Sequence, residues 1–352
     1  MSTYERVADL PLTIDDYELE GLQRTVGAGF DRHTTVIRLR GGGEEGLGED
    51  VTYMVEDQDA QQQHGPVLPL AGEWTFASFS DHLGELDLFP AREPTWEVFR
   101  NYRRWGFESA ALDLALRQAG TSLAEAVGRE LQPVAFVVST RMGEPPTIDP
   151  VSRRLARYPT LRFKLDATPD WGDELIEGLV ETGSVASLDF KGLYKGSDVE
   201  TPTDPEFYRR IAEAFPQAWL EDPDLELPDA REALAPFEDR ITWDAPIHSV
   251  DDILAQPVLP RTVNLKPSRF GPVRALFDAY DFCAERGMGA YGGGQYELGP
   301  GRGQIQYLAG LFHPDAPNDI APAGYDAIEP EPGLPLSPLT PAPEPTGFRR
   351  QS

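Results

Sequence analysis

The fold is decided by a short apolar stretch that ends in carboxylates, Trp219-Leu220-Glu221-Asp222-Pro223. Four more β-like segments around it also end in a lysine or a carboxylate. They are Arg162-Phe163-Lys164, Leu188-Asp189-Phe190-Lys191, Thr242-Trp243-Asp244 and Val263-Asn264-Leu265-Lys266. Each interval between these polar residues is about the length of one strand, one helix and their loops. The series therefore predicts repeated βα units.

The second half of the chain alternates strands and helices throughout. Predicted strands cover residues 134–138, 161–165, 186–190, 218–221, 241–244, 261–265 and 288–291, and predicted helices cover 173–181, 204–215, 229–237, 250–255, 271–286 and 305–312. Such alternation indicates parallel strands with crossover helices, and at least seven units favour a closed barrel over an open sheet. In a barrel, the polar residues would lie at the carboxyl ends of their strands, where barrel active sites are built.

Three regions of the chain differ in residue composition and in predicted secondary structure. Residues 1–130 predict an α+β domain, with strands at 34–39 and 51–55, a glycine turn at 41–43, and helices within 94–128. Residues 131–326 form the predicted barrel. Residues 327–352 are rich in proline and predict an extended tail, whose stretch 334–339 we expect to pack against the first domain. Loops at 21–29 and 41–48 are expected to close over the mouth of the barrel.

Net charge, hydropathy and cysteine content indicate which partners and which cell compartment to expect. A net charge of −28 argues against a nucleic-acid partner, and no apolar run reaches membrane-spanning length. The first sixteen residues are polar and acidic, without the pattern of a secretory signal. The single cysteine, Cys283, cannot form an intramolecular disulfide. These features predict a cytoplasmic protein without nucleic-acid or membrane partners, and they leave its oligomeric state open, a homo-oligomer included.

Three carboxylates would meet at the barrel mouth, from Asp189, Glu221 and Asp244. Such groups repel one another unless a cation lies among them, and all-oxygen ligation suits a hard ion such as Mg²⁺. Lys164 and Lys266 would lie on either side. The alternative is that each Asp caps a turn or a helix and that each lysine pairs with a carboxylate.

The ordered set of Lys, Asp, Glu, Asp and Lys on successive strands resembles the enolase superfamily, and more closely its muconate-cycloisomerase and o-succinylbenzoate-synthase branch. The resemblance covers roughly residues 30–325. It implies an enolase-type (β/α) barrel, a modified TIM barrel, with an N-terminal α+β capping domain. It also implies Mg²⁺ ligands at Asp189, Glu221 and Asp244, with catalytic lysines at Lys164 and Lys266.

The implied activity is that of a lyase or isomerase acting on a small-molecule carboxylate. Removing the proton next to a carboxylate creates an enediolate, and this superfamily combines a lysine or histidine base with Mg²⁺ to do so. The metal would stabilise the developing charge, and neighbouring cations would lower the pKa of the basic lysine. Dehydration, cycloisomerisation and epimerisation all stay open.

Three positions depart from the family pattern. Arg162 stands where lysine is frequent, Lys191 where asparagine is frequent, and Ala245 where glutamate is frequent. Strand alternation places Arg162 on the same face as Lys164, and Lys191 on the same face as Asp189, so both are candidate substrate contacts. Lys191 could instead replace the metal in an inactive, enolase-like binding protein. A third hypothesis is a Schiff-base barrel enzyme that uses Lys164 or Lys266.

A glycine-rich segment, residues 291–304, follows the seventh predicted strand and opens a helix. Glycine permits close backbone approach to a ligand, and a helix start offers N–H donors to an anion. We expect Gln295 and Glu297 to face the pocket and Arg302 to add a charge-assisted contact. The alternative is a tight turn that seals the barrel.

Overall fold

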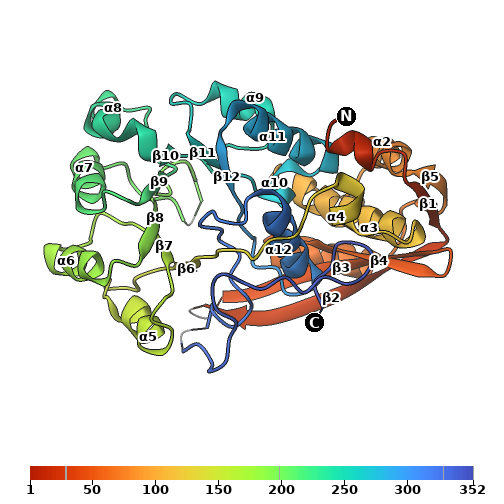
Figure 1. Ribbon diagram of the computed structural model, residues 1–352, viewed down its shortest axis with the longest axis horizontal. Helices are drawn as coiled ribbons and strands as arrows, with labels where there is room; N and C mark the ends of the chain where they lie inside the picture. The colour runs from red at the N-terminus through yellow and green to blue at the C-terminus, as the bar shows by residue number, and fades with distance from the viewer. Residues whose placement is uncertain (28–29, 198, 328, 352) are drawn as a thin grey trace.

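The protein consists of an N-terminal α+β domain beside a ring of parallel strands (Figure 1). The computed structural model describes residues 1–27, 30–197, 199–327 and 329–351. Within these ranges, no helix is both long and apolar enough to cross a membrane.

The N-terminal domain is built on a three-stranded antiparallel sheet, in the order β2-β3-β4, that packs on the long helix α3. Gly46 and Gly48 make this packing close, because a Cβ on either would lie about 2 Å from a carbonyl oxygen of α3. The elements are η1 (Tyr4–Arg6), β1 (Pro11–Ile14), β2 (Asp16–Val26), β3 (Phe30–Gly41), β4 (Glu44–Asp50), α1 (Val55–His64), β5 (Gly72–Thr75), α2 (Phe76–Glu85), α3 (Phe99–Gln118) and α4 (Leu123–Val127).

Two expectations for this domain are wrong. The strand predicted at 51–55 is not formed, because Gly42 and Gly43 make a tight turn and the next strand, β4, follows at once and ends at Asp50. For the same reason, residues 44–48 belong to a strand against α3 and do not form a loop over the barrel. The other loop was expected at residues 21–29. Of these, residues 21–26 belong to β2, and residues 28–29 lie outside the described residues.

The barrel follows the predicted alternation. Figure 1 shows α5 to α8 on the outer side of strands β6 to β10, with α10 and α12 toward the N-terminal domain. The elements are β6 (Val138–Thr140), α5 (Asp149–Arg157), β7 (Phe163–Asp166), α6 (Asp173–Thr182), β8 (Val185–Asp189), α7 (Pro205–Ala214), β9 (Trp219–Glu221), α8 (Pro228–Leu234), η2 (Ala235–Arg240), β10 (Ile241–Thr242), α9 (Val250–Ala255), β11 (Thr262–Asn264), α10 (Pro267–Phe270), α11 (Val273–Arg286), β12 (Gly289–Tyr291) and α12 (Pro300–Phe312).

Short contacts close the ring. Strands β6 to β10 form one parallel sheet and β11 pairs with β12, while the Asn264 N–H joins these two parts by donating to the Trp243 carbonyl (3.1 Å). On the other side, Asn318 lies between β12 and the first strand. Its side-chain oxygen accepts from the Gly292 N–H (2.7 Å), and its amide nitrogen donates to the Ala135 carbonyl (2.9 Å). The predicted (β/α) barrel with an N-terminal capping domain is confirmed.

Boundaries differ where local geometry interrupts an element. The predicted strand 134–138 begins as isolated bridges at Val134 and Phe136, and the regular strand β6 starts only at Val138. The predicted helix 271–286 is formed as α11 and begins two residues later, at Val273, because Gly271 ends the unpredicted short helix α10 with a positive φ of 76°. Helices α1, α2 and α5 were not predicted.

The described residues of the tail, 327 and 329–351, form no helix, as expected, but the tail packs elsewhere than predicted. Residues 334–339 lie on the barrel: Leu339 and Val134 exchange two backbone hydrogen bonds (2.7 and 3.0 Å), and the Ser337 hydroxyl accepts from the Phe136 N–H (3.0 Å). Residues further along reach the N-terminal domain, where the Gly347 carbonyl accepts from the Leu123 N–H (2.9 Å). The tail therefore contacts both parts of the molecule.

Candidate active site

Three carboxylates converge at the carboxyl ends of adjacent strands. Asp189 ends β8, Glu221 ends β9, and Asp244 lies two residues beyond β10; all three are fully buried. The parallel register places Asp189 opposite Glu221 and Glu221 opposite Thr242, so the three strand ends lie at one level. One oxygen from each carboxylate lies within 4.8 Å of the others. We call Asp189, Glu221 and Asp244 the carboxylate cluster.

Two buried lysines contact this cluster from different strands. Lys164, in β7, donates from Nζ to Glu221 and lies 3.2 Å from Asp189 Oδ2. Lys266, which follows β11, donates from Nζ to Asp244 Oδ2 (2.8 Å). Their strands have β8, β9 and β10 between them in the ring, so the two amines reach the carboxylates from separate positions.

The charges of the cluster perturb one another strongly. Burial alone would raise the pKa of Asp189, but Lys191 and Lys164 hold it well below its usual range. For Glu221, burial raises the pKa, and Lys164 only partly offsets this. Burial alone would lower the pKa of Lys164, yet Glu221 and Asp189 hold it well above its usual range. Such opposed shifts within one buried cluster are typical of functional sites.

Asp222 supports the cluster through backbone hydrogen bonds. Its carboxylate accepts from the N–H groups of Asp244 (2.8 Å) and Ala245 (2.9 Å), and it is fully buried. Burial, together with the charges of Asp244 and Asp189, raises its pKa. Asp222 thereby positions the backbone that carries Asp244, a role that its place in the sequence before a proline does not reveal.

Three further residues at the cluster were not predicted. The Arg269 guanidinium lies 3.2 Å from Asp244 Oδ1, and the Tyr194 hydroxyl donates to Asp244 Oδ2 (3.1 Å). The Tyr291 hydroxyl donates to Glu221. Tyr291 ends strand β12, so the strand-end rule that found the carboxylates could also have found it.

Lys266 lies against the backbone of Gly293. A Cβ on Gly293 would approach Lys266 Cε to 2.4 Å, and real Cβ atoms essentially never come so close to another heavy atom. The glycine therefore leaves room for the lysine to reach Asp244, which gives one glycine of the 291–304 segment a definite role.

We expect Gly293→Ala to displace Lys266 and to lower the rate of the reaction proposed below by about 100-fold, because small misplacements of reacting groups have effects of this size. Thermal unfolding should change little, since a flexible side chain gives way. Gly172→Ala is the matched control, because no heavy atom of the described residues, its chain neighbours apart, lies within 4 Å of the added Cβ. A full rate in Gly293→Ala would contradict this role.

Of the two predicted substrate contacts on the strands, Lys191 lies at the carboxylate cluster and Arg162 does not. Lys191 enters the cluster, where its Nζ donates to Asp189. Arg162 precedes β7 and is exposed, with its guanidinium 3.5 Å from the carbonyl of Val185 at the start of β8, so it lies at the end of the strands away from the cluster. Alternation alone does not bring Arg162 to the cluster, because Arg162 lies before the start of β7 and Lys164 lies within that strand.

The glycine-rich loop contacts the N-terminal domain. Gln295 donates from its side chain to the Tyr102 hydroxyl (3.0 Å), and Glu297 pairs with Arg302 (3.1 Å). The expected anion at the start of α12 is the chain's own Glu49, which accepts from the backbone N–H groups of Leu298, Gly299 and Gly301 (2.7–3.1 Å). The structure therefore brings Gln295, Glu297 and Arg302 to the junction of the domains and does not bring them to the carboxylate cluster.

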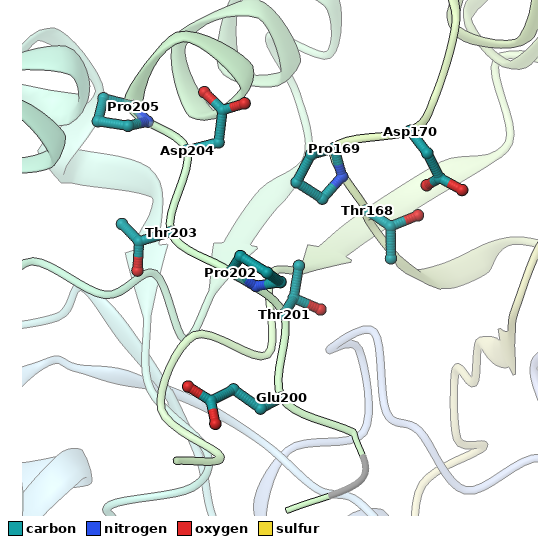
Figure 2. Close-up of a pocket in the computed structure, with 9 residues that line it drawn as sticks. All are labelled: Thr168, Pro169, Asp170, Glu200, Thr201, Pro202, Thr203, Asp204 and Pro205. Atoms are coloured by element: carbon teal, nitrogen blue, oxygen red, sulfur yellow. The ribbon is translucent and has the colours of Figure 1, made fainter. Parts of the chain in front are cut away.

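A cavity of about 590 Å³ lies between the loops that follow β7 and β8. Figure 2 shows its two walls, residues 168–170 and 200–205, facing one another. The walls consist of threonine, proline and acidic residues, and no residue of the carboxylate cluster lines them. We therefore do not assign the reaction to this cavity.

The carboxylate cluster fits a divalent cation. Asp244 Oδ1 is buried and accepts no hydrogen bond from the described residues, although the Arg269 guanidinium lies 3.2 Å away. One oxygen from each of the three carboxylates lies within reach of a single ion. Such a set of oxygen donors suits Mg²⁺ and similar hard cations.

Comparisons with solved structures agree with this architecture. An unknown member of the enolase superfamily from Enterococcus faecalis V583 has a TM-score of 0.63 at 19% identity, covering 88% of this chain and 86% of that one. Muconate cycloisomerase from Pseudomonas fluorescens has a TM-score of 0.58 at 18% identity, covering 88% and 87%. The fold is that of the enolase superfamily, as the sequence predicted.

Curated relatives are o-succinylbenzoate synthases. The protein from Bacillus subtilis (strain 168) is 29% identical over 225 residues, which is 61% of this chain and 58% of the relative. That from Geobacillus kaustophilus is 27% identical over 244 residues, or 66% and 63%. The matches thus span less than two thirds of these relatives. The chain belongs to the family described as domain of unknown function DUF8230, whose N-terminal domain matches residues 5–126 and whose C-terminal domain matches residues 130–327.

Proposed function

We propose that this chain is a Mg²⁺-dependent lyase or isomerase that removes the proton α to the carboxylate of a small molecule, through an enediolate. The observation that carries the proposal is the buried carboxylate cluster with two buried lysines, Lys164 in β7 and Lys266 just after β11. The enolase-superfamily fold and the o-succinylbenzoate synthase relatives support it.

In this proposal Asp189, Glu221 and Asp244 hold the ion. When bound, the cation would neutralise the carboxylates that hold the pKa of Lys164 high, and it would stabilise the negative charge that develops on the substrate. Lys164 removes the α-proton. Lys266, on the other side of the cluster, returns a proton or stabilises the intermediate by its charge.

The surroundings of the two lysines suit this chemistry. Lys164 and Lys266 are only 2% and 5% exposed, so bulk water is largely excluded from both amines. In such a site, charged groups interact more strongly than in water. Formation of o-succinylbenzoate is the first activity to test, because three curated relatives carry that enzyme's name.

The test is deuterium exchange of α-protons in D₂O, followed by NMR on a panel of carboxylic acids with Mg²⁺ present, together with an assay of o-succinylbenzoate formation. We expect exchange that stops on treatment with EDTA and returns when Mg²⁺ is restored. Asp244→Asn should abolish it, since one ligand is lost. Asp170→Asn, which changes an acidic residue of the outer cavity, is the matched control and should keep the wild-type rate. Exchange that persists at full rate in EDTA would refute the proposal.

A further inference from the structure

Lys191 is held in an unusual backbone conformation that turns it toward Asp189. Its φ of 53° is one that side-chain-bearing residues rarely adopt, and its N–H donates to Asp189 Oδ1 (3.0 Å). Its Nζ donates to Asp189 Oδ2. Strained backbone of this kind is maintained only where the surroundings over-determine it, and it concentrates at functional positions.

Two ammonium groups share one oxygen of the carboxylate cluster. Lys164 Nζ lies 3.2 Å from Asp189 Oδ2, and Lys191 Nζ contacts the same atom. A divalent cation that uses Asp189 as a ligand would meet both positive charges at close range. Because like charges at such distances repel strongly in a buried site, at least one ammonium has to withdraw.

Lys191 is the one that is free to withdraw. The side chain of Lys164 is 2% exposed and projects from within strand β7. The side chain of Lys191 is 15% exposed and belongs to the loop that follows β8. Movement of Lys191 would therefore disturb no strand of the barrel.

A second carboxylate is already within reach of Lys191. Asp166 Oδ1 lies 3.7 Å from its Nζ, and the side chain of Asp166 is 14% exposed. The Tyr194 ring, whose centroid lies 4.8 Å from the ammonium, adds a cation–π contact. The amine can thus shift from Asp189 to Asp166 without losing an anionic partner.

We propose that Lys191 is an internal counter-cation, which competes with the divalent metal for Asp189 and moves to Asp166 when the metal binds. The inference rests on the proposed function, since it takes the carboxylate cluster as the metal site. It gives Lys191 two effects. The residue compensates the buried carboxylates while no metal is bound, and it lowers the affinity of the cluster for the metal.

The experiment measures Mg²⁺ binding by calorimetric titration, with Mg²⁺ alone as the probe, together with the thermal midpoint. Lys191→Met should bind Mg²⁺ at least about tenfold more tightly than the wild type, because one positive charge near the ion is gone. Its midpoint without Mg²⁺ should fall. Lys191→Asn is the second variant, because asparagine tolerates a positive φ. Lys195→Met is the matched control: this lysine lies in the same loop, half exposed, and pairs with Asp224.

The outcomes separate this inference from the proposed function. Tighter binding in both Lys191 variants, with Lys195→Met unchanged, supports the inference. Binding that is present in the wild type and lost in Asp244→Asn, but no tighter without Lys191, overturns the inference and leaves the metal-dependent function standing. Absence of Mg²⁺ binding in the wild type and in every Lys191 variant overturns both.

Discussion

Replacing either Lys164 or Lys266 by alanine should reduce Mg²⁺-dependent α-proton exchange by about 10³-fold or more. Removal of a general acid or base typically costs 10²–10⁴-fold, and neither lysine has a substitute in the same position. Lys164 contacts Asp189 and Glu221, while Lys266 contacts Asp244 from another strand. The measurement is deuterium incorporation by NMR under single-substrate conditions.

Folding has to be checked in the same samples. Lys164→Ala leaves the buried Glu221 without its cation and Asp189 with Lys191 alone, which can cost about 3–5 kcal/mol of stability. Lys164→Arg and Lys266→Arg keep the positive charge but cannot act as a base, because arginine stays protonated. We expect both arginine variants to lose exchange while they remain folded. Lys195→Ala, a half-exposed lysine, should retain the wild-type rate.

The result that would refute these roles is equally definite. If Lys266→Arg exchanges α-protons at the wild-type rate, Lys266 transfers no proton, and its remaining role is that of a positive charge. If Lys164→Arg does so, the base must be sought among other groups at the cluster, and the assignment of Lys164 fails.

The barrel could be predicted because its strands carry a strong local signal. A strand buried on both faces is a short apolar run, and each run here ends in a polar residue followed by a loop. Asp189 and Glu221 emerged together because parallel strands bring their carboxyl ends to one edge. A rule that depends only on strand order and strand ends can be read from one sequence.

Contacts between distant segments could not be predicted in the same way. Arg269 and Tyr194 reach Asp244 by long side chains from a short helix and a loop, and no spacing in the sequence marks that meeting. Glu49 occupies the start of α12 from 249 or more residues away in the chain. Such partners depend on how the two domains are packed together.

Two other predictions failed because of where a residue lies along its strand and because of close backbone packing. Arg162 lies before the start of β7, beside the Val185 carbonyl, so a face shared with Lys164 does not bring it to the cluster. In the N-terminal domain, glycines of β4 pack on α3, so that strand lacks the alternating apolar side chains by which strands are recognised. The pattern of apolar and polar side chains in the sequence shows neither of these two features.

Deletion of residues 333–352 should destabilise the whole protein, although residues 333–351, which the structure describes, form no helix. Phe348 is fully buried and packs on the Tyr307 ring, with centroids 6.3 Å apart, and its N–H donates to Asp113 (3.1 Å). Leu339 is buried and pairs with Val134 of the barrel. Loss of two large buried side chains and their hydrogen bonds should cost on the order of 5 kcal/mol, or about 10 °C in the thermal midpoint.

Point substitutions separate packing from the mere presence of the tail. Phe348→Ala in the full chain should cost about 3–4 kcal/mol, because it removes a ring from a fully enclosed position. Leu336→Ala is the control within the same segment, since Leu336 is 53% exposed and its loss should change stability by less than about 0.5 kcal/mol. Chemical denaturation of the three variants beside the wild type measures each cost. Wild-type stability in the truncated chain would mean that the tail lies on the two domains without holding them together, and the contacts of Asp113 with Phe348 would then contribute nothing to folding.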